Sequence, residues 1–542
     1  MPRCLAAAGD CIQGVRIASA ALACAAVLAI GLALVSGGSG SDPRTPPALP
    51  GLPPPFLGTA VSGDGGLTAA VDAYGDVVDL RAPGPAGEAL IDNPSARQAA
   101  GTVPADTGIV PRVRIGGGSA LPMWRAESVS QRYLPGTNVV RTVGRFGGAR
   151  LVVIVATEGE RLAVDLRARS EAGGAAAVPS LTMNVESGLR CAREIRAGQL
   201  DLLCGLGRTV PPVPDAAAQD VIRSAAREAR RWLAESSPLG ATAPSWARAM
   251  YRHSLLRIHA LTSRATGAVA GGARDGWAYV WPRDAGTAAL ALAASGNRAE
   301  ARHVAKFLTG LDLAAAARFS ETGAPIPGRA AQGDAAGWVA VAAKATGLPV
   351  SHGPYAWRDR ADYQESSPGT YLGNALAAAA TRVDKQRETA EATRIAREFG
   401  TKAGLVRVAG DPGSGLDSAA GWAVRPFDLK PLYPTAERTL LRLAQHATAY
   451  GITPGEGWEG GEDPWTAPTA WSAWALAGLV AQGRGTADRR ATLALLTDLR
   501  RAATPAGALP ERVGAHTGIP TSTTPLLWSS AFAVLALCEL WG

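Results

Sequence analysis

The sequence predicts a multidomain protein of mixed α and β class, with an N-terminal antiparallel β-sandwich followed by an (α/α)6 barrel. Short β-branched or alternating runs, separated by Gly, Asp and Pro, occupy about residues 56–210, as is typical of sandwich strands. From residue 211 onward, apolar residues recur at the i, i+3, i+4 and i+7 spacing of amphipathic helices. The chain has 542 residues, of which 47% are hydrophobic and 18% charged, a composition that allows a large core and favours a folded chain over overall disorder.

Residues 1–37 are predicted to be an N-terminal transmembrane anchor, with a cleaved signal as the alternative. An apolar run from about Ile17 to Val35 follows Arg3 and Arg16. Its length is closer to the roughly 20 residues of a membrane-spanning helix than to the roughly 7–15 apolar residues of a cleavable signal. Positive charge before the run predicts that the rest of the chain lies outside the cytoplasm. We therefore expect an extracytoplasmic body held at the cell membrane, or a secreted protein if the segment is cleaved.

Residues 38–55 are rich in Gly and Ser and then in Pro, which is the composition of a spacer. In the predicted sandwich, residues 56–210, strands are expected at 67–71, 77–80, 138–143, 150–156 and 161–167. Cys191 and Cys204 lie close together in the same stretch. In an oxidising compartment they could form a disulfide across a hairpin, and two buried free thiols are the alternative.

Residues 211–542 are expected to form helix pairs that close into a barrel. The periodicity predicts helices at about 215–235, 245–263, 284–295, 298–311, 334–346, 370–382, 385–399, 435–449, 467–482, 486–501 and 524–541, with a further one near 416–424. A solenoid should show a repeating sequence period, and this chain shows none. The loops vary in length and carry Trp, Arg, Asp and Glu, so we expect a site on the loops at one rim.

The charge pattern does not predict a nucleic-acid partner. The formal net charge is +8, but the Arg residues are scattered singly or in pairs, with no dense basic block. The chain has six His, and no Cys/His spacing resembles a zinc site. No metal or other cofactor is predicted, and the sequence leaves calcium open.

Four loops combine aromatic and charged residues, and the first is residues 275–284. Pro282 suits the opening of a helix, and Asp284 suits its cap or first turn, so a plain capping role is one interpretation of Asp284. In the other interpretation, Trp281 is an apolar platform for a sugar, and Arg283 and Asp284 donate to and accept from two neighbouring sugar hydroxyls.

The other three loops are residues 357–373, 455–465 and 509–530. Their candidate residues are Trp357, Tyr363 and Glu365 in the first, Trp465 in the second, and Glu511 and Trp528 in the third. Taken singly, each acidic residue is better explained as a solvated loop charge, because strongly perturbed carboxylates are the minority. Trp528 falls on a predicted helix, so packing in the core is an equal alternative for it.

In combination these motifs resemble glycoside hydrolase family 15, the glucoamylase and glucodextranase group, over roughly residues 60–542. Trp-Pro-Arg-Asp at 281–284 is similar to the family's substrate-binding motif, and Gln332 to Trp338 looks like its Gln-x-Asp helix start. Tyr363-Gln-Glu365 is similar to its aromatic-x-Glu general-acid loop. Leu509-Pro-Glu511, with Pro-Leu-Leu-Trp-Ser at 525–529, resembles its general-base turn and final helix. Bacterial members place a β-sandwich before the barrel, so the chain looks like a membrane-anchored bacterial member.

The resemblance implies an exo-acting, inverting glycoside hydrolase for α-linked glucosides such as a glucan, a dextran or a trehalose-like sugar. It implies Glu365 as the general acid and Glu511 as the general base, two carboxyl groups whose surroundings keep one protonated and one ionised. The family commonly has Trp next to the acid, whereas here Gln364 intervenes, so Asp359 and Asp362 are rivals for that role.

The resemblance further implies that Arg283 and Asp284 bind the terminal sugar, with the aromatic walls provided by Trp281, Trp357, Tyr363, Trp465 and Trp528. The expected partner is an oligo- or polysaccharide substrate. A membrane-tethered carbohydrate-binding or cell-envelope protein with a degenerate catalytic site is the alternative with the same fold. A barrel lyase acting on acidic sugars through Tyr and His is a third, which the few His residues and the Leu-Pro-Glu turn disfavour.

Overall fold

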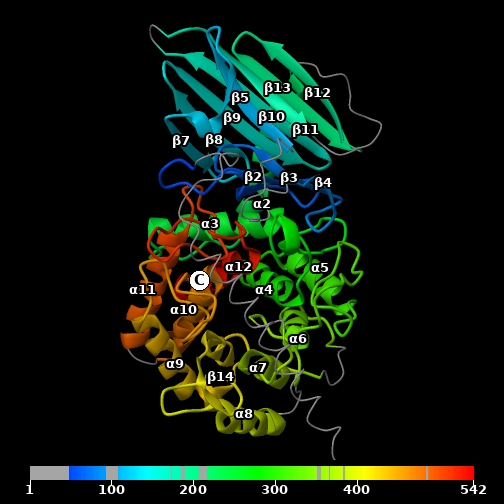
Figure 1. The fold of residues 1–542 in the computed structure, drawn as a ribbon. Helices are drawn as coiled ribbons and strands as arrows, with labels where there is room; N and C mark the ends of the chain where they lie inside the picture. Colours follow the sequence, from blue (N-terminus) through cyan, green and yellow to red (C-terminus); the bar gives the residue numbers. More distant parts are fainter. Residues whose placement is uncertain are drawn as a thin grey trace, which may run out of the picture. The chain divides into compact units, whose positions relative to one another are not determined.

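The computed structural model describes residues 48–92, 108–171, 174–184, 189–206, 216–350, 356–364, 367–381, 385–483 and 486–542. Within them, antiparallel sheets are followed by helices, as the sequence predicts (Figure 1). Pro46–Gly542 form one compact unit. The predicted anchor and most of the Gly/Ser/Pro-rich segment lie outside the described residues. None of the helices in the described part of the chain has the length and apolar character needed to cross a membrane.

Two antiparallel sheets make up the N-terminal part. The first has the order β1-β2-β3-β5-β11, with β4 beside β3 and β6 beside β5, and the second has the order β12-β13-β10-β9-β8-β7. Their bounds are β1 Gly58–Ser62, β2 Thr68–Asp72, β3 Val77–Ala82, β4 Glu88–Asp92, β5 Gly108–Ile115, β6 Ala120–Pro122, β7 Ser128–Tyr133, β8 Val140–Phe146, β9 Ala149–Glu158, β10 Arg161–Ser170, β11 Ala177–Asn184, β12 Leu189–Arg196 and β13 Gln199–Leu206.

The sheets pack face to face over an apolar core. Alternate residues of β9, such as Leu151 and Val153, share a buried cluster with Leu80 and Ile109 of the other sheet. This is the arrangement that strand alternation favours, because successive side chains point to opposite faces. Cys191 and Cys204 are directly opposite each other on β12 and β13, and their sulfurs form a disulfide. Of the two alternatives for this pair, the bridge is the one the structure contains.

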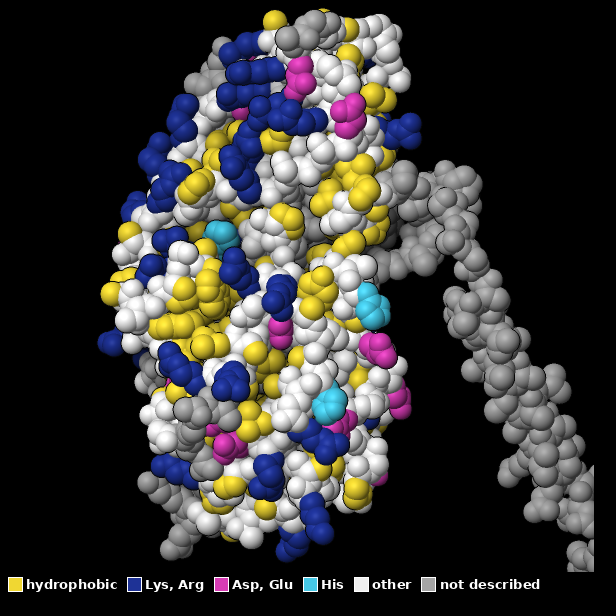
Figure 2. Space-filling view, turned by 90° about the vertical axis from the view of Figure 1, so that its left-hand side faces the viewer, with side chains coloured by type: hydrophobic (Ala, Val, Ile, Leu, Met, Phe, Trp, Pro, Cys, Tyr) yellow, Lys and Arg dark blue, Asp and Glu magenta, His cyan; other side chains and the backbone are white. Residues whose placement is uncertain are grey.

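Arginines gather on the outer face of the second sheet, on the side shown in Figure 2. Arg150 lies directly opposite both Arg145 and Arg169, and Arg132 lies opposite Arg141. Along the sequence these arginines are scattered singly or in pairs, and the antiparallel pairing of the strands brings some of them together. The prediction that nucleic acid is not a partner stays a prediction.

Each predicted helix is present with small shifts at its ends. The helices are α2 Ala216–Glu235, α3 Ser245–Ala260, α4 Pro282–Ala294, α5 Arg298–Thr309, α6 Ala335–Ala345, α7 Leu372–Ala380, α8 Lys385–Phe399, α9 Tyr433–Gln445, α10 Thr466–Ala481, α11 Thr486–Ala502 and α12 Leu527–Trp541. The element expected near 416–424 is a 3-10 helix, η4, at Ser418–Ala423. A hairpin of β14 Val406–Val408 and β15 Asp411–Leu416, which the sequence did not predict, precedes it.

Contacts between these elements close a ring. α4 contacts α6, α6 contacts α7, α7 contacts η4, η4 contacts α10, α10 contacts α12, and α12 contacts α4. α10 and α12 are buried on all sides over most of their length, which suits an inner layer. α5 and α9 each bury a single face against ring members, which suits an outer layer.

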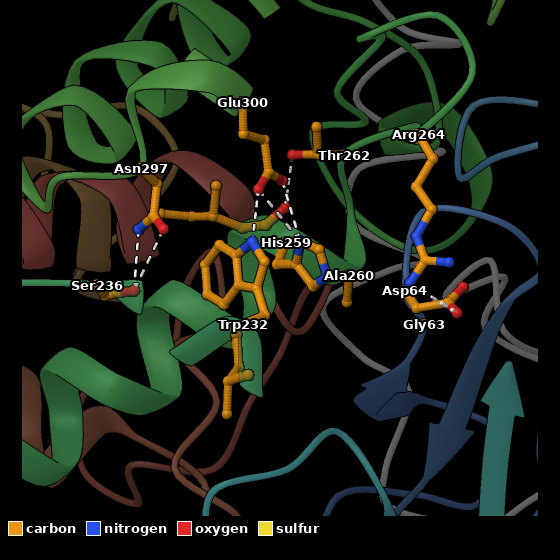
Figure 3. Close-up of polar contacts among 12 residues, drawn as sticks. Gly63, Asp64, Trp232, Ser236, His259, Ala260, Thr262, Arg264, Asn297 and Glu300 are labelled. Carbon is orange, nitrogen blue, oxygen red and sulfur yellow. Dashed lines mark hydrogen bonds and ion pairs between the residues drawn. The ribbon is translucent and has the colours of Figure 1, made fainter. Parts of the chain in front are cut away.

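An ionic cluster around the buried His259 joins α2, α3 and α5 (Figure 3). His259 of α3 stacks on Trp232 of α2 with ring centroids 4.2 Å apart. Its Nδ1 lies 3.0 Å from a Glu300 oxygen, and its Nε2 lies 3.4 Å from Glu228. Burial opposes the positive charge, but the hydrogen bonds to Glu228 and Glu300 outweigh it and raise the pKa of His259 to about 9. Beside this cluster, Arg264 forms ion pairs of 3.0 Å with Glu228 and with Asp64, so it links α2 to the loop between β1 and β2.

Candidate active site

A cavity of about 300 Å³ lies where several ring elements begin. Its walls come from the N-terminal ends of α4, α10 and α12 and from the loops that precede α6 and α7. The lining residues are Gly276, Trp277, Trp281, Arg283, Asp284, Arg318, Arg329, Gln332, Tyr363, Gln364, Trp465, Glu511, Arg512, Ser522, Leu526 and Trp528. The four predicted loop clusters therefore converge on one site.

Two side chains hold Arg283 in position. Its Nη1 donates to Gln332 Oε1 and to Asp334 Oδ2, both at 3.0 Å, and its guanidinium lies 4.6 Å from the centre of the Trp528 ring. The side chain is only 6% exposed. The Gln-x-Asp segment thus positions the arginine of the Trp-Pro-Arg-Asp motif, which explains why a buried charge is tolerated here.

The capping interpretation of Asp284 is wrong. Trp281 is the N-cap residue of α4, Pro282 is its first residue, and Asp284 lies within the first turn. Its Oδ2 is buried, 3.5 Å from Arg283 Nη2, and has no hydrogen-bond partner among the described residues. Burial raises the pKa of Asp284 to about 7 despite the opposing effect of Arg283. A buried carboxyl oxygen that lacks a hydrogen bond is costly, so it is suited to accept one from a ligand.

Glu511 is held by both its backbone and its side chain. Its N–H donates to Thr523 O at 2.9 Å, and its carbonyl accepts from Thr466 N–H at 3.0 Å. Trp277 Nε1 donates to Oε1 at 3.2 Å, and the Ser522 hydroxyl donates to Oε2. Burial raises the pKa of Glu511, while Ser522 and the nearby Arg512 act in the opposite direction. The carboxylate faces the same cavity as Asp284 but receives more hydrogen bonds.

Aromatic side chains form much of the wall, and among them are Trp281, Tyr363, Trp465 and Trp528. The three indole N–H groups are buried without a hydrogen-bond partner among the described residues. Trp528 is 4% exposed and packs on Trp471, so it belongs to both the core and the cavity wall. The aromatic walls therefore offer apolar faces together with unsatisfied donors, which is the combination that a sugar ring uses.

The loop before α7 is the least complete part of the site, because Glu365 lies outside the described residues. Gln364 lines the cavity and donates from Nε2 to Asp417 Oδ2 at 3.2 Å, and Tyr363 donates to Asp417 Oδ1 at 2.8 Å. Of the two rivals for the acid, Asp362 is buried and accepts from the Gln364 N–H at 2.8 Å, and Asp359 is exposed. Neither rival lines the cavity.

Trp357 is the one described aromatic candidate that does not line the cavity. Its ring lies beneath two guanidinium groups, those of Arg358 at 4.6 Å and Arg394 at 5.0 Å. Trp357 is half-buried against the apolar core, and these cation–π contacts cover its ring.

Several lining residues were not predicted. Trp277 and Ser522 fall in the predicted loops, but nothing in the sequence indicates that both hydrogen-bond Glu511. Arg318 and Arg329 line the cavity without any motif around them. Within the described ranges, no group of three or more His, Cys, Asp or Glu side chains is arranged to hold a metal ion.

Comparison with protein-family models gave no match, and comparison with curated proteins gave none either. Among solved structures, the chain is similar to the glucoamylase from Saccharomycopsis fibuligera, with 13% identity and a TM-score of 0.43 over 56% of this chain and 96% of that one. It is also similar to Hormoconis resinae glucoamylase, with 14% identity and a TM-score of 0.43 over 55% and 73%. The glycoside hydrolase family 15 glucoamylase from Hypocrea jecorina has 14% identity and a TM-score of 0.40 over 51% and 67%. These values are too low to assign a function, so the functional case depends on the cavity.

Proposed function

We propose that the protein is an exo-acting, inverting glycoside hydrolase for α-linked glucosides, built on an (α/α)6 barrel. The observation that carries the proposal is the convergence of Arg283, Asp284 and Glu511 on one aromatic cavity. A volume of about 300 Å³ is at the low end of small-molecule sites, which suits a single terminal sugar. The closed ring of contacts from α4 to α12 supports the barrel.

In this proposal Glu511 is the general base. Its carboxylate takes a proton from a water molecule, whose oxygen bonds to the anomeric carbon while the glycosidic carbon–oxygen bond breaks. Glu365 gives its proton to the leaving oxygen. It directly follows Gln364, which lines the cavity. An inverting pair needs its two carboxyl groups roughly 6.5–9.5 Å apart so that water fits between them.

The substrate-binding roles follow from the unsatisfied groups. Asp284 Oδ2 accepts from a hydroxyl of the terminal sugar, and the indole N–H groups of Trp281, Trp465 and Trp528 donate to its oxygens. Arg283 is already hydrogen-bonded to Gln332 and Asp334, and its guanidinium lies over the Trp528 ring at the cavity wall. Each bond would satisfy an atom that is otherwise buried and unpaired.

A carbohydrate-binding protein with a degenerate catalytic site is the second candidate, and Gln364 is the observation in its favour. An amide lines the cavity in the loop where a carboxyl group is required, and an amide has no acidic proton to give. Binding would survive in such a protein, and hydrolysis would be absent.

One substitution separates the two candidates. Purified protein is incubated with maltooligosaccharides, isomaltooligosaccharides and trehalose, and released glucose is measured. The glycosidase proposal expects Glu511→Gln to lower the rate by about 10²-fold or more, because a general base contributes roughly 10²–10⁴-fold. The matched control Glu235→Gln, at the exposed end of α2, should keep full activity. Equal rates in the two variants would refute the assignment, and absence of any hydrolysis in the unmodified protein would favour the second candidate.

We also propose that residues 1–37 anchor the protein in the cell membrane, that 38–55 form a linker, and that 56–210 and 211–542 are two domains in an extracytoplasmic body. The Cys191–Cys204 disulfide supports export, because such bonds persist in oxidising compartments. Alkaline carbonate extraction of membranes tests the anchor, since a peripheral protein would be released.

A further inference from the structure

A second and larger cavity adjoins the candidate active site. Its volume is about 910 Å³, and it shares Gly276, Trp277 and Arg318 with the first cavity. Its remaining walls are Arg81, Pro83, Ala86, Gly87, Glu88, Ala89 and Asp92 from the β3–β4 hairpin, and Tyr279, Ser320, Glu321, Thr322 and Ile326 from loops of the helical part. We call this space the outer chamber. Figure 1 shows β3 and β4 on the side of the sheets that faces the helices.

The β3–β4 hairpin is fastened to the helical part by a reciprocal contact. Ala86 N–H donates to Glu321 Oε2 at 3.2 Å, and Glu321 N–H donates to Ala86 O at 3.3 Å. Thr266 also donates to Glu321 at 2.8 Å, which holds the carboxylate in place. Gly84 has a φ of +72°, and a Cβ there would lie 2.4 Å from Glu321 Oε1, so this close approach requires glycine.

The hairpin is also braced from within. Arg81 forms two hydrogen bonds to Asp79, at 2.9 and 3.0 Å, and donates to Gly87 O at 3.3 Å across the turn. Both side chains of this ion pair are buried. The hairpin wall of the outer chamber is therefore preorganised. A ligand that binds there does not lose free energy to the ordering of a loop.

Trp277 forms the partition between the two cavities. Its Nε1 donates to Glu511, the proposed base, while the residue lines both spaces. Beside it, the Arg318 guanidinium lies 4.8 Å from the centre of the Tyr279 ring, and Arg318 Nε is buried without a hydrogen-bond partner among the described residues. Aromatic faces next to spare donors are a surface for sugar units.

The charges of the outer chamber favour a neutral ligand. Arg81 forms an ion pair with Asp79, and the remaining charged groups of the lining include Arg318 and the carboxyl groups of Glu88 and Glu321. An acidic polymer would meet a surplus of negative charge there, so an uncharged saccharide fits better.

We propose that the outer chamber binds the leaving-group side of the substrate, as a neutral oligosaccharide of several sugar units, and that the β3–β4 hairpin sets the preference for chain length. This inference rests on the proposed function. The terminal sugar occupies the small cavity, the bond to be cut passes Trp277 and Glu511, and the rest of the chain extends against Tyr279 and the hairpin.

The test measures binding by isothermal titration calorimetry in full-length protein carrying Glu511→Gln, so that no sugar is consumed. The probes are maltose and maltohexaose, with isomaltose and isomaltohexaose as the second series. We expect the hexamer of one series to bind about ten-fold more tightly than its dimer, because the hexamer places five units in the outer chamber and the dimer places one.

Two chamber variants and their matched controls complete the design. Ala89→Trp, which fills the chamber from β4, and Tyr279→Ala, which removes its aromatic wall, should each weaken binding of the hexamer far more than binding of the dimer and so abolish the advantage of the hexamer. Ala89→Ser and Tyr450→Ala should preserve it. Far-UV circular dichroism checks the fold of each variant. If Ala89→Trp does not fold, the loss of the hexamer advantage in Tyr279→Ala is the result that tests the proposal.

Three results would overturn the inference: dimer and hexamer binding equally in both series, the advantage surviving in Tyr279→Ala, or no binding of any of the four sugars. The proposed function fails in a different way, by absence of hydrolysis in the protein with Glu511 intact. If the hexamer binds through the chamber but the protein with Glu511 intact hydrolyses nothing, the chamber proposal stands and the catalytic assignment is rejected.

Discussion

The cluster around His259 predicts that the protein loses stability at alkaline pH, and the raised pKa of His259 gives the size of the loss (Figure 3). The pKa of His259 is about 9 in the folded protein, against an ordinary value of 6.5. Because one unit corresponds to about 1.36 kcal/mol, protonated His259 contributes about 3 kcal/mol to the free energy of unfolding. A folded pKa above the unfolded one means that this contribution is fully present below pH 6.5 and is lost as pH rises through about 9.

The perturbation is His259→Gln, which removes the charge between Glu228 and Glu300 while keeping a polar side chain. Urea unfolding followed by circular dichroism gives the difference in unfolding free energy between variant and unmodified protein at several pH values. We expect about 3 kcal/mol near pH 6 and a difference that shrinks steadily toward pH 10. His446→Gln, at an exposed position after α9, is the control and should change little at any pH. A difference that is the same at both ends of the pH range would refute the reasoning.

Four further predictions follow from particular contacts. The rate of hydrolysis should fall on the acid side with an apparent pKa above the ordinary 4.5 of Glu, because burial raises the pKa of Glu511 and protonation removes the base. Reducing the Cys191–Cys204 bridge should lower the free energy of unfolding by about 3 kcal/mol in urea titrations, as expected for a loop of this length. Arg150→Thr should raise it by about 0.2–1 kcal/mol at low salt and less at high salt, because directly opposed arginines repel. Gly337→Ala should lower it by about 1–3 kcal/mol, since a Cβ there would lie 2.2 Å from a carbonyl oxygen of α7.

Each of these has a result that contradicts it. An acid limb at or below the ordinary Glu value would remove Glu511 from the role of base. Unchanged unfolding in reductant would mean that the bridge does not constrain the unfolded chain. A salt-independent effect of Arg150→Thr would exclude repulsion as its cause. Gly117→Ala, at a glycine with open space around it, is the control for Gly337→Ala, and equal effects of the two would contradict the packing argument.

The sequence predicted the helices well because each is long and keeps one apolar periodicity over several turns. It predicted the strands less completely. β6 at Ala120–Pro122 is too short to show an alternation, and β12 carries charged residues on an exposed surface rather than an apolar face. The β14–β15 hairpin contains Asp411-Pro-Gly-Ser-Gly, a composition typical of a loop, so local preference could not indicate strands there.

The site was predictable where a motif opens a helix, as at Arg283 and Asp284, because the start of α4 fixes where those side chains point. It was not predictable where two distant segments meet. Trp277 reaches Glu511 only because the loops before α4 and α12 lie against each other, and a local sequence pattern does not indicate such a contact. Trp357 is a case in which a motif misleads. Its place beside the polar and aromatic loop predicts a cavity wall, whereas its ring lies under Arg358 and Arg394.

The most direct test of the account follows the anomeric configuration of the first glucose released from an α-linked substrate, by proton NMR within the first minutes of reaction. A base at Glu511 that delivers water to the face opposite the leaving group predicts β-glucose as the initial product, with α-glucose appearing only later by mutarotation. The same spectra from Glu511→Gln should show almost no release. Initial α-glucose, or unchanged release by that variant, would contradict the central claim.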